Sequence, residues 1–382
     1  MNWKLYSKSI ELILENQSVT GAYVASPSFP TYNYCWLRDG SFIAHAMDTA
    51  GEFTSAEAFF RWVGRTIQKF SYKVEDIRQR LETGQAIGKD DVLHTRFTLD
   101  GEEVYVDSTW GNFQIDGYGS WLWALAEHVR LSGDSALLKE LSEPILTSLR
   151  YLELVWELPN YDCWEEHPEY LHPYSLATVF AGFDAVVSLV RTGQMDPTPV
   201  DVEQLAQKVK EFILEYGVYK DRLVKHIQPA DPNTPPQPVL HSGVDSSLLG
   251  LTIPYNVLSP HDPIIQNTIQ SIEADLHRPN GGVYRYLADV YYGGGEWHLL
   301  TAWLGWYYAH IGKKEQAQVM LEWIESKEEA GGFLSEQVSD HVLAPIHYEP
   351  WLKKWGPIAS PLLWSHAMYI ILINSIQEDK TR

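Results

Sequence analysis

Two adjacent glutamates, Glu165 and Glu166, lie in the segment CWEEH, between a tryptophan and a histidine. Neighbouring carboxylates repel each other, and this repulsion tends to keep one of them protonated near neutral pH. A protonated carboxylic acid beside an apolar ring is what a general acid requires. Paired glutamates are more often part of a solvated helix face, so it is the aromatic loop around them that favours chemistry here.

A second carboxylate follows in the segment GGFLSEQVSD, which contains Glu336. The glycines Gly331 and Gly332 allow the backbone to approach a ligand closely. The same residues also fit a helix that begins at Ser335, with Glu336 in its first turn. Both interpretations of Glu336 stay open on these residues alone.

An arginine and an aspartate occur together in two aromatic segments, as Arg38 and Asp39 in YCWLRDG and as Arg285 and Asp289 in YRYLADVYY. Such a pair offers donors and acceptors to two neighbouring hydroxyl groups, although Asp39 also fits a helix cap and Arg38 a surface charge. Sugar rings carry C–H patches that pack on indole rings as well as hydroxyls that pair with charges, so the combination points to carbohydrate. The tryptophans that would supply stacking faces are Trp36, Trp110, Trp164 and Trp297.

Composition excludes several other functions. A net charge of -21 and a pI of about 5.0 argue against nucleic-acid binding. Two cysteines without a CxxC motif make a disulfide framework and a structural zinc site unexpected. HExxH, GxSxG and GxGxxG motifs are absent, and histidines near the aromatic loops, among them His167 and His172, are expected to form hydrogen bonds or lie in the core. We therefore expect no metal and no cofactor.

The ends of the chain indicate a soluble protein. The start, MNWKLYSKSIELILENQ, is an amphipathic pattern that lacks the apolar run of a signal peptide. The apolar stretch LLWSHAMYIILI near the other end is too short to span a bilayer. We expect a cytoplasmic protein without membrane contact, as a monomer or weak homo-oligomer.

Most of the chain has the periodicity of helices. The segment DVEQLAQKVKEFILEYG, for example, places apolar residues on one face from Val202 to Tyr216. Short extended pieces are predicted around Glu102 to Val106 and Gly282 to Tyr286. About twelve helices are predicted, beginning near residues 3, 39, 54, 116, 135, 175, 200, 244, 262, 296, 313 and 360.

Every second predicted helix follows a loop rich in tryptophan, tyrosine, glycine and charge. The six loops are YNYCWLRDG, STWGNFQIDGYGS, YDCWEEHPEYLHPYS, HSGVDSS, YRYLADVYYGGGEW and HYEPWLKKWGPIASP. This alternation predicts an all-α (α/α)6 barrel, a ring of six helical hairpins with the six loops on one face. The inner helices would then direct their N-termini, with free N–H groups and partial positive charge, at a shared site.

The spacing of the loops separates a closed ring from an open solenoid. A solenoid repeats at a nearly constant period, whereas these loops recur irregularly, at intervals of 49 to 80 residues. The proline-rich segment Asp231 to Pro238 fits an insertion loop better than a linker. We therefore predict a single catalytic domain over residues 1–382.

Taken in order, seven segments resemble glycoside hydrolase family 15, the glucoamylase family, over residues 31 to 367. They are TYNYCWLRDGSF, STWGNFQIDGYGSWLWAL, YDCWEEH, HSGVDSSLLGL, VYRYLADVYYGGGEWHLLTAW, FLSEQV and PLLWSHA. The resemblance implies an (α/α)6 barrel and an inverting, exo-acting α-glucoside hydrolase. It makes Glu165 the general acid and Glu336 the general base.

The resemblance also implies the other site residues. Glu166, Arg38, Asp39 and Arg285 would grip the non-reducing glucose, and the four tryptophans would form aromatic walls. Tyr32 and Gln337 would flank the catalytic water.

Substrate choice stays open at this level. The chain carries neither the N-terminal β-sandwich nor the starch-binding module of many family members, so it resembles the short members that act on isomaltose. We expect short isomalto- and malto-oligosaccharides as substrates and β-D-glucose as product. The alternatives are a trehalose hydrolase of the same family, a non-catalytic sugar-binding regulator, which would not need both Glu165 and Glu336, and a sugar epimerase, which would favour histidine acid–base pairs.

Overall fold

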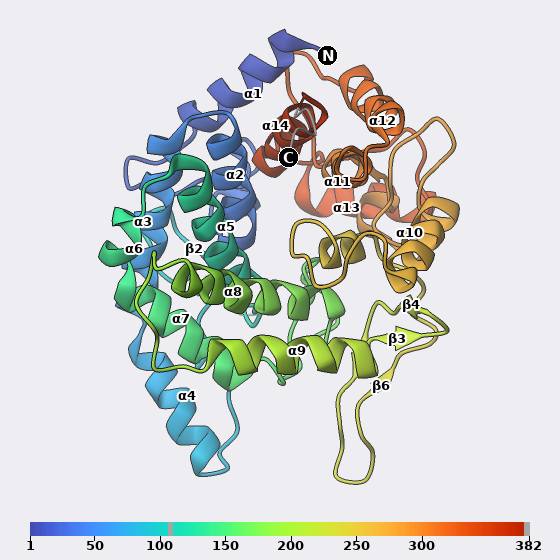
Figure 1. Ribbon diagram of the computed structural model, residues 1–382. Helices are drawn as coiled ribbons and strands as arrows, with labels where there is room; N and C mark the ends of the chain where they lie inside the picture. The colour runs from blue at the N-terminus through green and yellow to red at the C-terminus, as the bar shows by residue number, and fades with distance from the viewer. Residues whose placement is uncertain (106–109, 378–382) are drawn as a thin grey trace.

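The computed structural model describes residues 1–105 and 110–377. Within these ranges the chain forms fourteen α-helices, four short 3-10 helices and four pairs of two-residue antiparallel strands (Figure 1). The α-helices are α1 (Trp3–Glu15), α2 (Leu37–Thr49), α3 (Phe53–Lys69), α4 (Tyr72–Glu82), α5 (Asp116–Ser132), α6 (Ala136–Glu140), α7 (Ser142–Val155), α8 (Pro173–Arg191), α9 (Val202–Tyr216), α10 (Pro263–Asp275), α11 (His298–His310), α12 (Lys314–Ser326), α13 (Tyr348–Trp355) and α14 (Leu363–Gln377).

The 3-10 helices are η1 (Pro30–Tyr32), η2 (Ser246–Leu251), η3 (Tyr291–Gly293) and η4 (Pro345–His347). The strand pairs are β1 (Cys35–Trp36) with β2 (Arg96–Phe97), β3 (Val218–Tyr219) with β4 (Arg222–Leu223), β5 (Ile227–Gln228) with β6 (Gln237–Pro238), and β7 (Glu296–Trp297) with β8 (Gln337–Val338).

Six elements form a closed inner ring. In chain order α2, α5, α8, η2, α11 and α14 each pack against the next, and α14 packs against α2. These α-helices are buried on nearly every side, as helices inside a large core must be, and in α11 every residue from His298 to Ala309 is buried. The predicted all-α (α/α)6 barrel is confirmed.

The outer layer consists of α1, α3, α7, α9, α10 and α12, each packed on the inner ring. These helices are amphipathic: α9, for instance, buries the stripe that runs from Val202 to Ile213 and turns its charged residues to solvent. Its first turn is capped by the side chain of Asp201, which accepts a hydrogen bond from the backbone N–H of Gln204 at 3.1 Å. Each hairpin of the ring consists of an outer helix and the inner helix that follows it in the chain.

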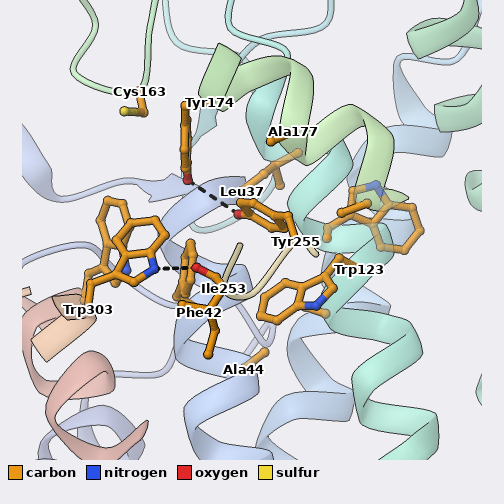
Figure 2. Close-up of a cluster of buried hydrophobic side chains, with 14 of the residues drawn as sticks. Leu37, Phe42, Ala44, Trp123, Cys163, Tyr174, Ala177, Ile253, Tyr255 and Trp303 are labelled. Carbon is orange, nitrogen blue, oxygen red and sulfur yellow. Dashed lines mark hydrogen bonds between the residues drawn. The ribbon is translucent and has the colours of Figure 1, made fainter. Parts of the chain in front are cut away.

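Aromatic side chains fill the interior of the ring (Figure 2). Some of their polar atoms are paired: Trp303 donates to the backbone carbonyl of Ile253 at 2.7 Å, and the hydroxyls of Tyr174 and Tyr255 lie 3.4 Å apart. Cys163 lies near Tyr174, so the loop that carries the CWEEH motif rests directly on this core. A packed interior of this kind holds the loops above it rigidly in place.

The helix predictions differ from the structure in several places. The helix expected near residue 244 is only the short 3-10 helix η2, because Pro254, which an α-helix interior excludes, follows three residues after its end. The helix expected from residue 135 is divided into α6 and α7. Two helices, α4 and α13, were not predicted, since α4 buries only three residues and α13 buries none.

The extended pieces also differ from expectation. Around Gly282 to Tyr286 the structure has isolated bridges through Val283 rather than a strand. Of the piece from Glu102 to Val106, Glu103 forms one bridge with Phe97, and Val106 lies outside the described residues.

One helix in the described part of the chain, α8, is long and apolar enough to cross a membrane. It belongs to the inner ring, and 78% of its most apolar window is buried against neighbouring elements. Burial in the core accounts for its composition.

Candidate active site

A cavity of about 310 Å³ lies among the loops that lead into the inner helices. Eleven of the thirteen residues proposed from sequence line it. They are Tyr32, Trp36, Arg38, Asp39, Trp110, Trp164, Glu165, Glu166, Arg285, Trp297 and Glu336. Residues more than 300 positions apart in sequence are brought together here because the closed ring places its first and last hairpins side by side.

Glu165 is held in the cavity by a tight turn that Asp162 organises. One carboxylate oxygen of Asp162 accepts hydrogen bonds from the backbone N–H groups of Trp164 and Glu166, both at 2.9 Å. Glu165 adopts a left-handed conformation with φ 66°. Strain of this kind in a residue other than glycine persists where the surroundings enforce it, and it is concentrated at functional sites.

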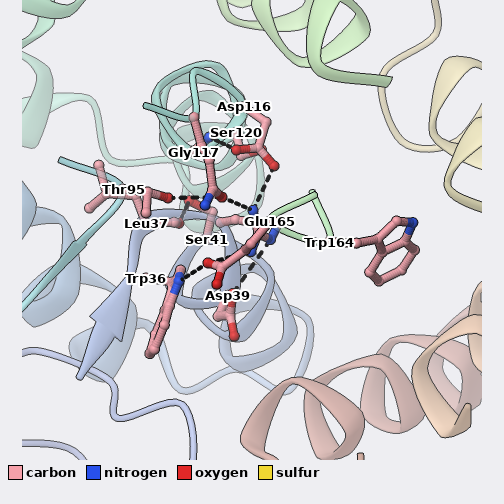
Figure 3. Close-up of polar contacts among 12 residues, drawn as sticks. Trp36, Leu37, Asp39, Ser41, Thr95, Asp116, Gly117, Ser120, Trp164 and Glu165 are labelled. Atoms are coloured by element: carbon pink, nitrogen blue, oxygen red, sulfur yellow. Dashed lines mark hydrogen bonds and ion pairs between the residues drawn. The ribbon is translucent and has the colours of Figure 1, made fainter. Parts of the chain in front are cut away.

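The side chain of Glu165 lies against the start of α2 (Figure 3). Trp36 donates its indole N–H to Oε1 of Glu165 at 2.5 Å, and Nη2 of Arg38 lies 3.8 Å from the same oxygen. The hydrogen bonds and ion pairs of the described residues engage Oε1 and leave Oε2 for a ligand.

Glu166 has separate partners. It accepts a hydrogen bond from the hydroxyl of Tyr286, and Nη2 of Arg285 lies 3.5 Å from its other oxygen. The two adjacent carboxylates therefore interact with different groups on two sides of the cavity. The sequence suggested that mutual repulsion would give the two carboxylates different roles, but their different positions separate the roles more strongly.

Glu336 enters the cavity from another loop, just before β8. Its backbone N–H donates to the carbonyl of Ala359 at 2.9 Å, and its Oε1 accepts from the hydroxyl of Tyr32 at 3.0 Å. Oε2 is buried and has no hydrogen-bond partner among the described residues. Burial raises the pKa of Glu336 to about 7, against the opposing effects of the Tyr32 hydrogen bond and the charge of Arg285.

Tyr291 belongs to the site although the sequence analysis did not single it out. Its hydroxyl lies 2.7 Å from that of Tyr32, so Tyr291, Tyr32 and Glu336 form a chain of hydrogen bonds. The segment YRYLADVYYGGGEW was recognised as an aromatic loop, but its tyrosines cannot be ranked without coordinates.

Arg38 is fixed at the start of α2 by partners on the next inner helix and its loop. Its Nη1 donates to Gln114 and to Asp116, both at 2.9 Å. Its Nε is buried without a hydrogen-bond partner in the described part of the chain. The neighbouring Asp39 lines the cavity, and burial raises the pKa of its carboxyl to about 7 despite the charge of Arg38.

Arg285 is held by Asp289, whose two oxygens accept from Nε at 2.7 Å and from Nη2 at 2.5 Å. Its guanidinium lies 5.3 Å from the ring centroid of Trp164 and 5.2 Å from that of Trp297. A bidentate ion pair and two neighbouring indole rings together fix the orientation of the cation.

Two of the proposed residues lie behind the cavity wall. Asp289 is buried, and its oxygens accept hydrogen bonds from Arg285 and from the backbone N–H of Tyr291. Gln337 is likewise buried, accepting from Gly295 N–H at 2.8 Å and donating to the carbonyl of Tyr291 at 3.2 Å. With these polar atoms already paired, both residues position the lining and do not face a ligand.

Helix α13 adds three lining residues that the sequence analysis did not assign: Trp351, Lys354 and Trp355. The ring of Trp351 packs edge-on against Tyr291, with centroids 5.0 Å apart. Nζ of Lys354 lies 5.2 Å from the Trp351 ring and 4.8 Å from the Trp355 ring. These residues lie on the partly exposed side of the cavity.

The arrangement suits acid–base chemistry on a neutral polyhydroxy ligand. Two carboxylates enter from different loops, fixed cations and acids supply hydrogen-bond partners, and tryptophans supply flat walls. Trp36 packs with Trp110 at 6.1 Å between ring centroids, and Trp164 packs with Trp297 at 5.6 Å. Neither carboxylate needs a cofactor to donate or accept a proton.

Comparison with known proteins agrees with this description. The sequence matches the family described as glycosyl hydrolases family 15 over residues 1–340. It is 35% identical to an isomaltose glucohydrolase of Kribbella flavida, over 98% of this chain and 92% of the relative. It is 25% identical to a trehalase of Thermoplasma acidophilum, over 84% of this chain and 55% of that longer protein. A solved structure of a glycosidase variant in complex with glucose superposes with a TM-score of 0.89 at 35% identity, covering 98% of this chain and 96% of that one.

Proposed function

The chain belongs to glycosyl hydrolase family 15 and is a glucoamylase-like exo-α-glucosidase, and from this premise we propose how its site works and on what. Glu165 is the general acid and Glu336 the general base of an inverting hydrolysis. The substrates are short α-glucosides such as isomaltose, from whose non-reducing end β-D-glucose is released. The observation that carries the proposal is that both carboxylates line one cavity with Arg38, Asp39 and Arg285.

Glu165 protonates the glycosidic oxygen as the bond to the leaving sugar breaks. The hydrogen bond from Trp36 fixes Oε1, so the other carboxyl oxygen is directed to the substrate. In an inverting enzyme this single proton transfer completes the work of the acid.

Glu336 removes a proton from the water that attacks the opposite face of the sugar. Its unpartnered Oε2 is a buried acceptor, a position that favours binding of such a water. The Tyr32 hydrogen bond holds Oε1 and stabilises the carboxylate form. Inversion needs carboxyl groups roughly 6.5–9.5 Å apart, which leaves room for the water between base and sugar.

The size and lining of the cavity support exo action on small substrates. A volume of about 310 Å³ is at the low end of ligand pockets and matches one or two sugar rings. Arg38, Asp39, Glu166 and Arg285 would bind hydroxyls of the terminal glucose, while the tryptophans pack on its C–H faces. Helix α13, with Trp351 and Lys354, would contact the leaving sugar and so influence linkage preference.

The proposal is tested by measuring glucose release from isomaltose, maltose and trehalose. Glu165→Gln and Glu336→Gln should each lower kcat by about 10²–10⁴-fold, the usual contribution of one acid or base. The matched control is Glu169→Gln, since Glu169 is an exposed acid of the same loop and should be dispensable. Retention of activity in Glu336→Gln would exclude its role as base.

Trehalose hydrolysis is the second candidate, favoured by the similarity to the Thermoplasma trehalase. It would use the same acid and base and differ in the residues around the leaving sugar. A kcat/KM at least tenfold higher for trehalose than for isomaltose would select it. Absence of glucose from all three sugars would instead favour a sugar-binding protein without catalysis.

A further inference from the structure

Three buried side chains that commonly bind metals converge behind the turn that carries Glu165. They are Asp162, just before the turn, His172, just before α8, and His226, just before β5. Each offers one oxygen or nitrogen, and these atoms all lie within 4.8 Å of one another. The side chains are only 4%, 2% and 3% exposed, so the cluster is part of the interior.

Asp162 carries an oxygen that the turn does not use. Its Oδ1 accepts the two backbone N–H groups of the turn, but its Oδ2 is buried and has no hydrogen-bond partner in the described part of the chain. A buried carboxylate oxygen without a partner is costly, because desolvation is not repaid by a new interaction. The atom therefore indicates a ligand that supplies the missing contact.

The two imidazoles face each other in a way that suits a shared ion. Nδ1 of His172 lies 2.9 Å from Nδ1 of His226, while Nε2 of His172 lies 2.7 Å from the backbone carbonyl of Asn160. That carbonyl requires a proton on Nε2, which leaves a lone pair on Nδ1 pointing into the cluster. A histidine that donates its other N–H to a backbone carbonyl is the usual arrangement behind a metal ligand.

A hydrogen bond between the two histidines is the simpler explanation of this contact, but it leaves Oδ2 of Asp162 unpaired. Lys225, next to His226 in sequence, acts on Asp162 through its charge but forms no ion pair with it among the described residues: its Nζ lies 3.3 Å from Asp245 and 3.0 Å from the ring centroid of Tyr286. One ion bound to all three residues would account for both observations.

We propose that Asp162, His172 and His226 bind one divalent transition metal ion of the zinc type. Nitrogens 2.0–2.1 Å from a common ion and 2.9 Å apart subtend an angle of about 90°. Two imidazoles and one carboxylate favour zinc, cobalt, nickel or copper over magnesium and calcium, which prefer oxygen ligands. His167 lies next to the cluster, with its ring centroid 4.7 Å from that of His226.

This proposal departs from the expectation of no metal site, and the reason lies in the spacing. Asp162 and His172 are ten residues apart and His226 follows 54 residues later, a pattern that matches no short metal motif. The fold brings the three together through the bridge between Leu171 and Ile227. Because Asp162 and His172 flank the segment of Glu165, the ion would tie the turn of the site to the start of α8.

The test uses the full chain without a histidine tag, freed of metal by a chelator and then dialysed against ZnCl2 or MgCl2. Mass spectrometry of the bound metal should find one zinc per chain and no magnesium. His226→Asn should weaken zinc binding at least about tenfold. The matched control, His261→Asn, removes an exposed histidine from another loop and should bind zinc as the unaltered chain does.

A second readout protects the test against misfolding of the variant. Cobalt bound to the unaltered chain should give the visible absorption of nitrogen and oxygen ligands, and zinc, but not magnesium, should raise its thermal midpoint. Zinc content equal in the unaltered chain and His226→Asn would overturn the proposal. So would the absence of both the cobalt spectrum and the zinc-dependent shift.

Discussion

At the scale of single residues, the site depends on carboxyl groups whose pKa burial has raised. Glu336 and Asp39 both have a pKa raised to about 7, in each case mainly because burial disfavours the charged form. Fixed donors oppose this effect, Tyr32 for Glu336 and Arg38 for Asp39. A base that titrates near neutral pH is suited to catalysis there.

Replacing Tyr32 by phenylalanine should change the pH profile of the enzyme. The hydroxyl of Tyr32 donates to Glu336 and thereby lowers its pKa, so its removal raises the pKa. Since the base must be deprotonated, the acidic limb of kcat/KM should move to higher pH, by up to about one unit, the equivalent of one hydrogen bond. Steady-state kinetics between pH 4 and 9 measure this, with Tyr219→Phe on β3 as control, and a limb that stays in place or moves to lower pH contradicts the assignment.

Glu336 should also make stability depend on pH. Its folded pKa of about 7 exceeds the usual 4.5, so the folded state holds the proton more tightly than the unfolded state does. The resulting stabilisation is complete below about pH 4.5 and is lost as pH rises through 7. Glu336→Gln should therefore be more stable than the unaltered chain at pH 8, by on the order of 2 kcal/mol, and should differ much less at pH 5.

Urea unfolding at the two pH values measures this difference. Glu169→Gln, which alters an exposed acid, should show no comparable change. The stability difference between Glu336→Gln and the unaltered chain is compared at the two pH values. If this difference favours the variant less at pH 8 than at pH 5, the pKa of Glu336 is not raised.

The sequence predicts the site residues whose type is unusual for their loop. It does not reveal the residues whose role depends on contacts made in the folded chain. Glu165 and Glu336 could be proposed because paired acids and an acid after glycines stand out among tryptophans. Tyr291, Gln114 and Asp116 could not, since tyrosine, glutamine and aspartate are common in such loops and only the folded chain places them against Tyr32 and Arg38.

At the scale of elements, the inner helices position the site and their packing fixes the loops. Helices α5 and α8 approach closely where a Cβ atom on Gly119 would lie 2.1 Å from the carbonyl oxygen of Thr178. Backbone atoms cannot yield as a flexible side chain can, so glycine is required at this position.

Gly119→Ala should accordingly separate α5 from α8. The expected loss of folding free energy is about 1–3 kcal/mol, the usual cost of overpacking a core, and kcat should fall because Asp116, at the start of α5, would no longer hold Arg38 in place. Gly133→Asn is the control, since Gly133 ends α5 with φ 74° in open space and asparagine tolerates that conformation. Thermal unfolding measures both, and an unaltered midpoint in Gly119→Ala would refute the close contact.

Periodicity predicted the helices of both layers but not the local departures. The apolar stripe of α9 and the uniformly apolar α14 were visible in the sequence. The sequence predicts an α-helix at η2 because the apolar residues match a buried helix, whereas the shortness of η2 depends on the proline beyond it. α13 was treated as part of a loop, although its tryptophans line the cavity, because eight residues are too few for a periodic signal.

At the scale of the whole molecule, closure of the ring brings the six loops together at one site. The hydroxyl of Tyr369 on α14 donates to the backbone carbonyl of Asn2 at 3.2 Å, so the last inner helix is joined to the start of the first hairpin. The irregular loop spacing indicated a closed ring in advance, and the structure confirms it. The cytoplasmic location and the monomeric or weakly oligomeric state stay predictions.

The most direct test of the central claim is the configuration of the sugar at the instant of release. Proton NMR during hydrolysis of isomaltose, recorded before mutarotation equilibrates the anomers, shows which form of glucose is produced first. Attack by a water that Glu336 activates, on the face opposite the leaving group that Glu165 protonates, predicts β-glucose from the α-linkage. α-Glucose as the first product would contradict the account, because it would require a covalent intermediate and a different arrangement of the two carboxylates.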